Sequence, residues 1–375
     1  MLTLVQIEAI GIKAQQITDP IIKFLIEDIA RRVTEAGQLT STASYQVWRL
    51  QHLGVSQRQM KKELRKLLKV SHRELRKLLT QAAETGYDFD IKRFPYVQSV
   101  PFAQNETIQN IVAAAVQLAR DDLTNMVQTI GFVGHDGTAR TLTRAYEDAC
   151  DFAFRKVATG AQDYNSAVRQ AVKGLADRGI VTIDYESGVS TALDAAVRRN
   201  VLGGLGLMQE QIAQYMHDEM GCDGWEISAH AASAPDHEPI QGRQYTDSEY
   251  TALNDSLVRR IGTLNCGHSA FPIILGSRPQ HTPQELEQFR QSNQKGIEYG
   301  GKHYTVYEAT QHQRKLERMI RKQKRKIQLR AATGDAEKLA QDQSKLVSLN
   351  QEYARFTRAA GLRSQKARLA VAGFK

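Results

Sequence analysis

The stretch Glu63-Leu-Arg-Lys-Leu-Leu68 returns as Glu74-Leu-Arg-Lys-Leu-Leu79, eleven residues further along the chain. Eleven residues make three turns of an α-helix, so both copies place their leucines on one face. These leucines are Leu64, Leu67, Leu68, Leu75, Leu78 and Leu79. The other face is cationic, with Arg58, Lys61, Lys62, Arg65, Lys66, Lys69, Arg73, Arg76 and Lys77. We predict one long helix packed through its leucines, with a solvated basic face; contact with nucleic acid or a membrane surface is the alternative.

The composition of the whole chain predicts a mainly α protein. Of 375 residues, 41% are hydrophobic, which is enough for two or three ordinary cores. Aromatic residues make up 7%, charged residues 24%, and there are only 8 prolines, which argues against a sandwich or barrel. The longest apolar runs fall short of the ~20 residues of a membrane-spanning helix. The first residues lack a secretion signal, and three cysteines cannot all pair, so we expect a reducing, intracellular origin.

Shifts in pattern divide the chain into segments. Pro95 and Pro101 predict an irregular connection from Gly86 to Pro101, helical periodicity returns at Ile108, and Gly134 to Gly137 reads as a turn. Residues 180–183 favour a short strand or an extended link. The predicted organisation is a basic helical region at 1–86, a loop at 87–105, a helical domain at 106–220, a small α+β module at 221–302, a basic helical hairpin at 303–360, and a loose tail at 361–375.

The C-terminal segment at residues 311–375, which holds most of the predicted hairpin and the tail, carries the whole excess of positive charge. Residues 311–375 contain 17 Lys and Arg against 5 Asp and Glu, whereas the net charge of the chain is +9. Apolar residues at helical spacing predict two arms that pack together, the first of them basic on its outer side. That side could be solvated or could bind nucleic acid or a partner protein. The candidate binding residues are Arg314, Lys315, Arg318, Arg321, Lys322, Lys324, Arg325 and Lys326.

The α+β module contains a set of residues that could bind a metal ion. Strand-like patterns at Trp225 to Ser228 and Phe271 to Leu275 enclose His230, His237, Cys266 and His268. Two residues two apart in an extended segment point to the same side, so Cys266 and His268 could share an ion. One thiolate with three imidazoles suits zinc in a structural role. Histidines that make only ordinary hydrogen bonds are the simpler alternative.

The same residues allow a catalytic hypothesis. Cys266 with His230 or His237 could form a nucleophile and base, oriented by Asp236 or Glu238. A zinc hydrolase would need an open coordination position and a base such as Glu238, yet the sequence has no His-Glu-x-x-His helix. Dinucleotide and P-loop fingerprints are also missing from the sequence. We therefore predict that the protein is not an enzyme.

Several motifs in one order resemble a known family. They are Trp225-Glu-Ile-Ser-Ala-His230, Pro235-Asp-His237, Gln241-Gly-Arg243, Asn265-Cys-Gly-His268 and Tyr307-Glu-Ala-Thr-Gln-His-Gln-Arg314, preceded by Asp122-Leu-Thr-Asn125, Asp184-Tyr-Glu-Ser-Gly188 and Val197-Arg-Arg-Asn200. The chain resembles the phage minor capsid proteins of Gram-positive-type tailed phages, which are similar to the Mu F-like head-morphogenesis proteins. The resemblance runs from about Tyr87 to the C-terminus. Two positions depart from it, because a basic residue is expected where Ala234 and Gly267 stand.

The resemblance implies a low-copy structural protein of the phage head. It implies association with the portal and capsid components inside the virion, assembly in the host cytoplasm, and contact with DNA during packaging or ejection. It also supports a metal site at His230, His237, Cys266 and His268. The alternatives are a non-specific double-stranded DNA-binding protein and, third, a zinc- or cysteine-dependent hydrolase.

Overall fold

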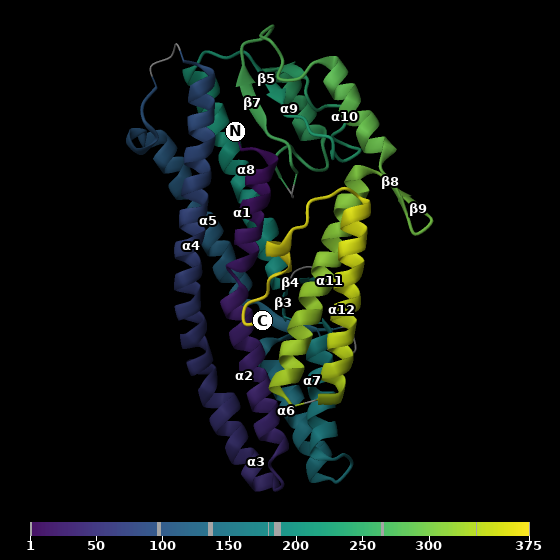
Figure 1. Cartoon of the computed structure of the whole chain (residues 1–375). Coiled ribbons are helices and arrows are strands. Elements are labelled where there is room, and N and C mark those ends of the chain that lie inside the picture. Colours follow the sequence, from purple (N-terminus) through teal and green to yellow (C-terminus); the bar gives the residue numbers. More distant parts are fainter. Residues whose placement is uncertain are drawn as a thin grey trace.

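The leucine repeat lies in α4 (Ser56–Arg93), which runs along one side of an elongated, mainly helical molecule (Figure 1). The computed structural model describes residues 2–95, 99–133, 138–178, 180–183, 189–263, 266–334 and 336–374. Leu75, Leu78 and Leu79 are buried, as the periodicity predicts. They face the core that α4 shares with α5 (Glu106–Gln128) and α8 (Leu193–Glu219). The opposite, basic face of α4 is exposed.

The predicted irregular connection from Gly86 is wrong for its first half, because α4 continues to Arg93. Tyr87 is almost completely buried, and its hydroxyl donates a hydrogen bond to the carbonyl of Val100 at 2.6 Å. The Asn105 amide donates to the Tyr87 hydroxyl and to the Tyr215 hydroxyl, each at 3.0 Å. These contacts stabilise the C-terminal end of α4. Pro95 and Pro101 interrupt regular helix only after this end. The short 3-10 helix Phe102–Gln104 then leads into α5.

The N-terminal and central helices share one hydrophobic core. The N-terminal part comprises α1 (Leu4–Gln16), α2 (Asp19–Gly37), α3 (Thr42–Arg49) and a π-helical segment (Leu50–Val55). The central part adds α6 (Leu142–Ala158) and α7 (Tyr164–Arg178) to α5 and α8. Buried side chains from Leu2 to Met220 form one continuous cluster. No helix in the described part of the chain is long and apolar enough to cross a membrane.

The central region also contains a four-stranded antiparallel sheet, with strand order β2-β1-β3-β4. The strands are β1 (Ile130–Val133), β2 (Ala139–Thr141), β3 (Ile180–Ile183) and β4 (Ser190–Ala192). Only β3 was among the predicted possibilities. Strands of three or four residues are too short to show a clear alternation. Two of them, β2 and β4, also run directly into a helix, so the helical periodicity hides them. The predicted turn at 134–137 and the motif at 184–188 lie outside the described residues.

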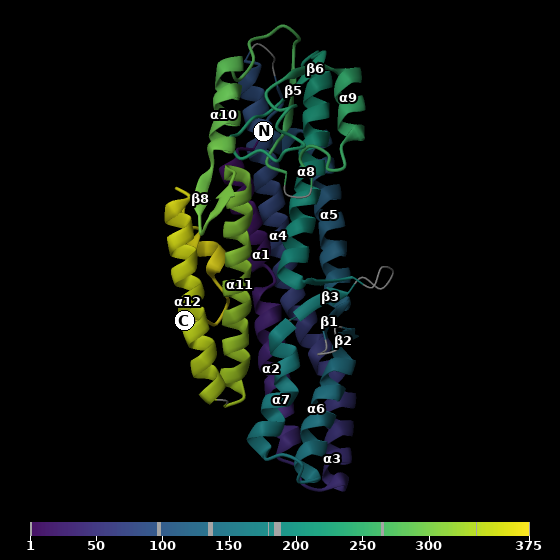
Figure 2. The same cartoon turned by 90° about the vertical axis from the view of Figure 1, so that its right-hand side faces the viewer.

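The predicted α+β module forms one end of the molecule (Figures 1 and 2). Strands β5 (Gly224–Ile227), β6 (Gln244–Thr246) and β7 (Ala270–Ile273) make a sheet with β5 in the middle, so both predicted strands are confirmed. Helices α9 (Asp247–Ser256) and α10 (Pro283–Lys295) and the hairpin of β8 (Ile297–Tyr299) with β9 (Lys302–Tyr304) complete it. Gly206 of α8 touches the carbonyl of Gly262, where any Cβ would overlap it. This close approach seats the module on α8.

The C-terminal hairpin is confirmed as α11 (Val306–Ala332) and α12 (Ala336–Ala359), which pack through Leu316, Ile320, Ile327, Leu346, Tyr353 and Phe356. Helix α12 lies on the outside, and α11 lies between α12 and the helical body (Figure 2). The predicted basic outer side of the first arm is therefore wrong in part. Many of its arginines point inward because carboxylates of the body lie opposite them.

The predicted loose tail is also wrong. Its backbone carbonyls accept hydrogen bonds from α11: Arg321 to Arg368, Lys324 to Leu369 and Gln328 to Ala372, at 2.8 to 2.9 Å. A short 3-10 helix (Lys366–Leu369) buries the Arg368 side chain, and Val371 is buried as well. The long cationic side chains of α11 thus hold the tail in place.

Candidate metal centre

Three of the four predicted metal ligands meet in the interior of the module. His237 lies in the turns between β5 and β6, whereas Cys266 and His268 precede β7. One ligand atom from each of the three residues lies within 4.8 Å of the other two, and all three residues are buried. The Cys266 sulfur is 3.2 Å from His237 Nδ1 and 3.4 Å from His268 Nδ1. The extended Cys-x-His segment therefore places both side chains on one side, as the spacing predicts.

Hydrogen bonds on the far side of each imidazole orient both rings. His237 Nε2 lies 2.8 Å from the Arg259 carbonyl oxygen, which can only accept a hydrogen bond. His268 Nε2 lies 3.0 Å from Gln241 Oε1. Protons at both Nε2 atoms leave the Nδ1 lone pairs facing the sulfur. The thiol has one proton for two lone pairs, so one Nδ1 faces the sulfur without a hydrogen bond. A cation between the three atoms would satisfy all of them, and such outer bonds are usual for metal-bound histidines.

His230 lies beside this cluster without joining it. Its ring stacks on His268 with 4.3 Å between centroids, and neither ring nitrogen has a hydrogen-bond partner among the described residues. Gly267 makes room for it, because a Cβ at that position would lie 2.9 Å from His230 Nε2. The chain thus carries glycine where the resemblance led us to expect a basic residue. The three clustered residues fit a structural zinc ion, and His230 is the nearest candidate for the fourth ligand.

The catalytic hypothesis is less well supported by this geometry. Cys266 is buried, and burial raises the pKa of its thiol, which disfavours a free thiolate. Asp236 pairs with Arg259 at 2.6 Å, and Glu238 accepts a hydrogen bond from Asn293 at 2.9 Å. Both carboxylates proposed as orienting groups or bases are thus engaged elsewhere. The arrangement favours ion binding over nucleophilic attack.

The eight predicted partner-binding residues of α11 separate into an inner and an outer set. Lys315, Arg318 and Lys322 are exposed, whereas the others are wholly or partly buried. Arg321 and Arg325 each lie 3.2 Å from Asp194 of α8, and Arg314 lies 3.4 Å from Glu8 of α1. Lys324 binds the tail carbonyl, and Lys326 lies 3.4 Å from Asp342 of α12. Most of the positive charge of this arm therefore joins helices within the molecule.

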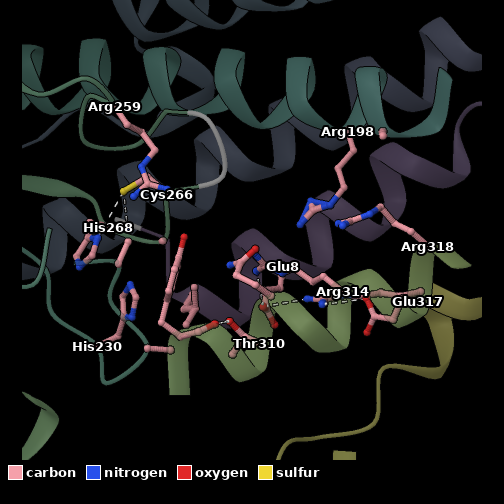
Figure 3. Close-up of a pocket in the computed structure, with 18 of the residues that line it drawn as sticks. Glu8, Arg198, His230, Arg259, Cys266, His268, Thr310, Arg314, Glu317 and Arg318 are labelled. Carbon is pink, nitrogen blue, oxygen red and sulfur yellow. Dashed lines mark hydrogen bonds and ion pairs between the residues drawn. The ribbon is translucent and has the colours of Figure 1, made fainter. Parts of the chain in front are cut away.

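A cavity of about 290 Å³ connects the metal cluster with arginines of α8 and α11 (Figure 3). His230, Cys266 and His268 lie at one end of the view, and Arg198, Arg314 and Arg318 lie at the other. Helices α1, α8 and α11, the module and the C-terminal tail all contribute to its wall. Ala234 and Gly267, where the chain departs from the expected pattern, both line it.

Comparison with known families agrees with the resemblance seen in the motifs. The family model of phage minor capsid protein 2 matches residues 21–357 of the chain. The chain belongs to this family. No curated protein and no solved structure gave a significant match. The match covers most of the helical body, the module and the hairpin, whereas α1 and the C-terminal tail lie outside it.

Three residues of the minor capsid protein that contact the buried, inner set of α11 were not among the predicted site residues. Asp194, Glu8 and Arg368 come from α8, α1 and the tail, far from α11 in sequence. Arg198 is part of the motif Val197-Arg-Arg-Asn200, but the motif alone did not assign it a role. Glu8 has no distinguishing pattern around it. Asn265, part of another motif, lies outside the described residues.

The buried histidines predict acid sensitivity of the minor capsid protein. Burial lowers the pKa of His230 to about 4 and that of His268 well below its usual value. Below pH ~6.5 the unfolded chain binds protons that the folded chain does not, so the free energy of unfolding decreases as the pH falls toward 4. The slope is at most about 1.4 kcal/mol per pH unit for each histidine. Protons that displace a bound metal act in the same direction.

Urea unfolding at pH 7.0, 5.5 and 4.5 measures this dependence. His230→Gln should flatten the slope, whereas His303→Gln, at an exposed histidine of β9, should leave it as in the wild type. A free energy of unfolding that increases as the pH falls from 6.5 to 4.5 would contradict the assignment of His230 and His268 as buried, neutral histidines.

Proposed function

We propose that this minor capsid protein is a structural part of the phage head that binds the portal inside the virion and catalyses no reaction. The observation that carries the proposal is the family match over residues 21–357. The geometry agrees with it, since long helices joined by buried ion pairs make a stiff body suited to holding other proteins in place. A zinc ion at His237, Cys266 and His268, with His230 beside them, would stabilise the module and take no part in chemistry.

Portal association is tested by co-sedimentation of the full-length protein with assembled portal at moderate salt. The proposal expects stoichiometric co-sedimentation and the presence of the chain in purified virions. A packed protein interface should be only moderately sensitive to salt. Loss of portal association, with DNA binding retained, would favour the second function below. Turnover of a substrate that is lost in Cys266→Ala, while the fold stays intact, would favour the hydrolase.

The second candidate function is non-specific contact with double-stranded DNA, and the exposed face of α4 favours it. A helix of 38 residues is about 57 Å long, which exceeds one turn of B-form DNA. Glu63 is paired with Lys66 at 2.9 Å, so Glu74 is the main opposing charge. Of the two basic helices, α4 supports this candidate better than α11, because its cationic side chains are exposed. The exposed basic residues are Lys61, Lys62, Arg65, Lys66, Lys69, Arg73, Arg76 and Lys77.

This DNA-binding face predicts a steep dependence of affinity on salt. The slope of log K against log salt should be about −0.9 for each phosphate that the face neutralises. Replacing Lys62, Arg65, Lys69 and Arg73 by glutamine should reduce the slope by about 3 to 4. The matched control replaces four exposed residues of the hairpin, Lys315, Lys322, Lys345 and Arg358, by glutamine. Equal loss of affinity in both variants would show that total charge, and not α4, sets the binding.

A further inference from the structure

We propose that the cavity lined by arginines binds a phosphate-type dianion. Six arginines line the cavity: Arg198, Arg259, Arg314, Arg318, Arg321 and Arg368. Among the described residues that line it, the only carboxylates are Glu8 and Glu317. The proposal is independent of portal binding, because it concerns a site inside this chain.

Neighbouring carboxylates behind the wall neutralise two of the six arginines. Asp236 pairs with Arg259 at 2.6 Å, and Asp194 lies 3.2 Å from Arg321. Glu8 and Glu317, in the wall itself, contact two others. Arg368 lies 2.9 Å from Glu8 and 3.5 Å from Glu317, and Arg314 lies 3.4 Å from Glu8. Among the described residues, the lining thus gathers six arginines but only two carboxylates.

The positions of these guanidinium groups suit an anion between them. Arg198 from α8 and Arg318 from α11 point toward one another (Figure 3). Gly11 of α1 makes room for the Arg198 guanidinium, which a Cβ at that position would touch. Arg368 is buried, and its Nε has no hydrogen-bond partner among the described residues. Burial and the nearby Arg314 and Arg368 also lower the pKa of Arg198 to about 10. Like charges held together in this way are stabilised by an anion.

Charge and size select the class of ligand. A phosphate monoester carries about −1.5 to −2 charges at pH 7 and presents three oxygens, so it can bind several guanidinium groups at once, whereas a carboxylate carries one charge. Planar guanidinium groups bind phosphate oxygens in pairs. A volume of about 290 Å³ corresponds to roughly ten water molecules, enough for a phosphate and a few waters. A DNA duplex, with a major groove about 12 Å wide, cannot enter. Arg318 is exposed as well as lining the cavity, so the ligand can reach it from solvent.

Isothermal titration calorimetry of the full-length protein with inorganic phosphate, at constant ionic strength, tests the proposal. We expect saturable binding of one phosphate and a rise in Tm that equal ionic strength of sodium chloride does not produce. Arg198→Gln should weaken binding about tenfold or more, since it removes a charged hydrogen-bonding group. Arg199→Gln is the matched control, because Arg199 is the exposed neighbour outside the cavity wall. Its affinity should equal that of the wild type.

Two further experiments complete the test. If Arg198→Gln does not fold, Arg318→Gln and its control Lys322→Gln provide the same comparison at exposed positions of α11. Titration with adenosine 5′-monophosphate against adenosine asks whether the phosphate is taken free or as part of a nucleotide, and both outcomes support the site. The proposal is overturned if phosphate does not saturate, if acetate binds as well as phosphate, or if each arginine variant matches its control.

Discussion

Removal of the zinc ion proposed at His237, Cys266 and His268 is expected to unfold the module at residues 221–302 while the helical body stays folded. Structural zinc contributes an apparent binding free energy on the order of 10 kcal/mol at pH 7, and this module has only short strands to replace it. Its separate core is small and contains Ala213, Trp225, Ile227, Tyr250 and Ile261. The body keeps a large continuous core of its own. A chelator should therefore unfold the module and leave the helical body folded.

Metal content and Trp225 fluorescence measure this effect. Trp225 is buried in the module, and a Trp48→Phe background removes the other tryptophan, which lies in α3. The purified protein should contain one zinc per chain, and Cys266→Ala with His268→Ala should contain none. Cys222→Ala is the matched control, because Cys222 lies in the module but outside the cluster, and it should retain the metal. Wild-type protein that has no metal and gains no stability from added zinc would disprove the site.

Loss of the Asp194 carboxylate is expected to have the second largest effect. Asp194 is buried in α8 and accepts hydrogen bonds from Arg321 and Arg325 of α11, each at 3.2 Å. The two guanidinium groups hold the pKa of Asp194 below its usual value despite burial. Asp194→Ala leaves both arginines without this partner in a buried position. Breaking a buried ion pair in this way typically costs about 3 to 5 kcal/mol.

Chemical unfolding at neutral pH compares this variant with a surface control. Glu287→Ala removes an exposed ion pair with Arg290 on α10, and it should leave the free energy of unfolding almost unchanged. Asp194→Asn keeps the shape of the side chain and removes its charge, so it should resemble Asp194→Ala. Equal and small effects for all three variants would mean that the ion pairs do not hold the hairpin to the body.

Local patterns were sufficient to predict the main elements. The eleven-residue repeat predicted α4 and its buried leucines, and the apolar spacing predicted the two arms of the hairpin. Alternation at Trp225 and the apolar run at Phe271 predicted β5 and β7. Cys266 and His268 were predicted to share a site because their spacing alone puts them on one side of an extended segment. In each case the information lies within a few helical turns or one strand.

The sequence by itself therefore determined the helical class, the α+β module, the hairpin and the candidate metal residues. Tertiary structure decided which basic residues are free to meet a partner. In sequence, α11 is the most cationic segment, yet Asp194, Glu8 and Asp342 pair with its arginines and lysines from other helices. The physical reason is that helical periodicity specifies an apolar seam, whereas the charge opposite any other face depends on which distant helix packs there. For the same reason only the fold could reveal the arginine cavity, whose wall comes from five separate parts of the chain.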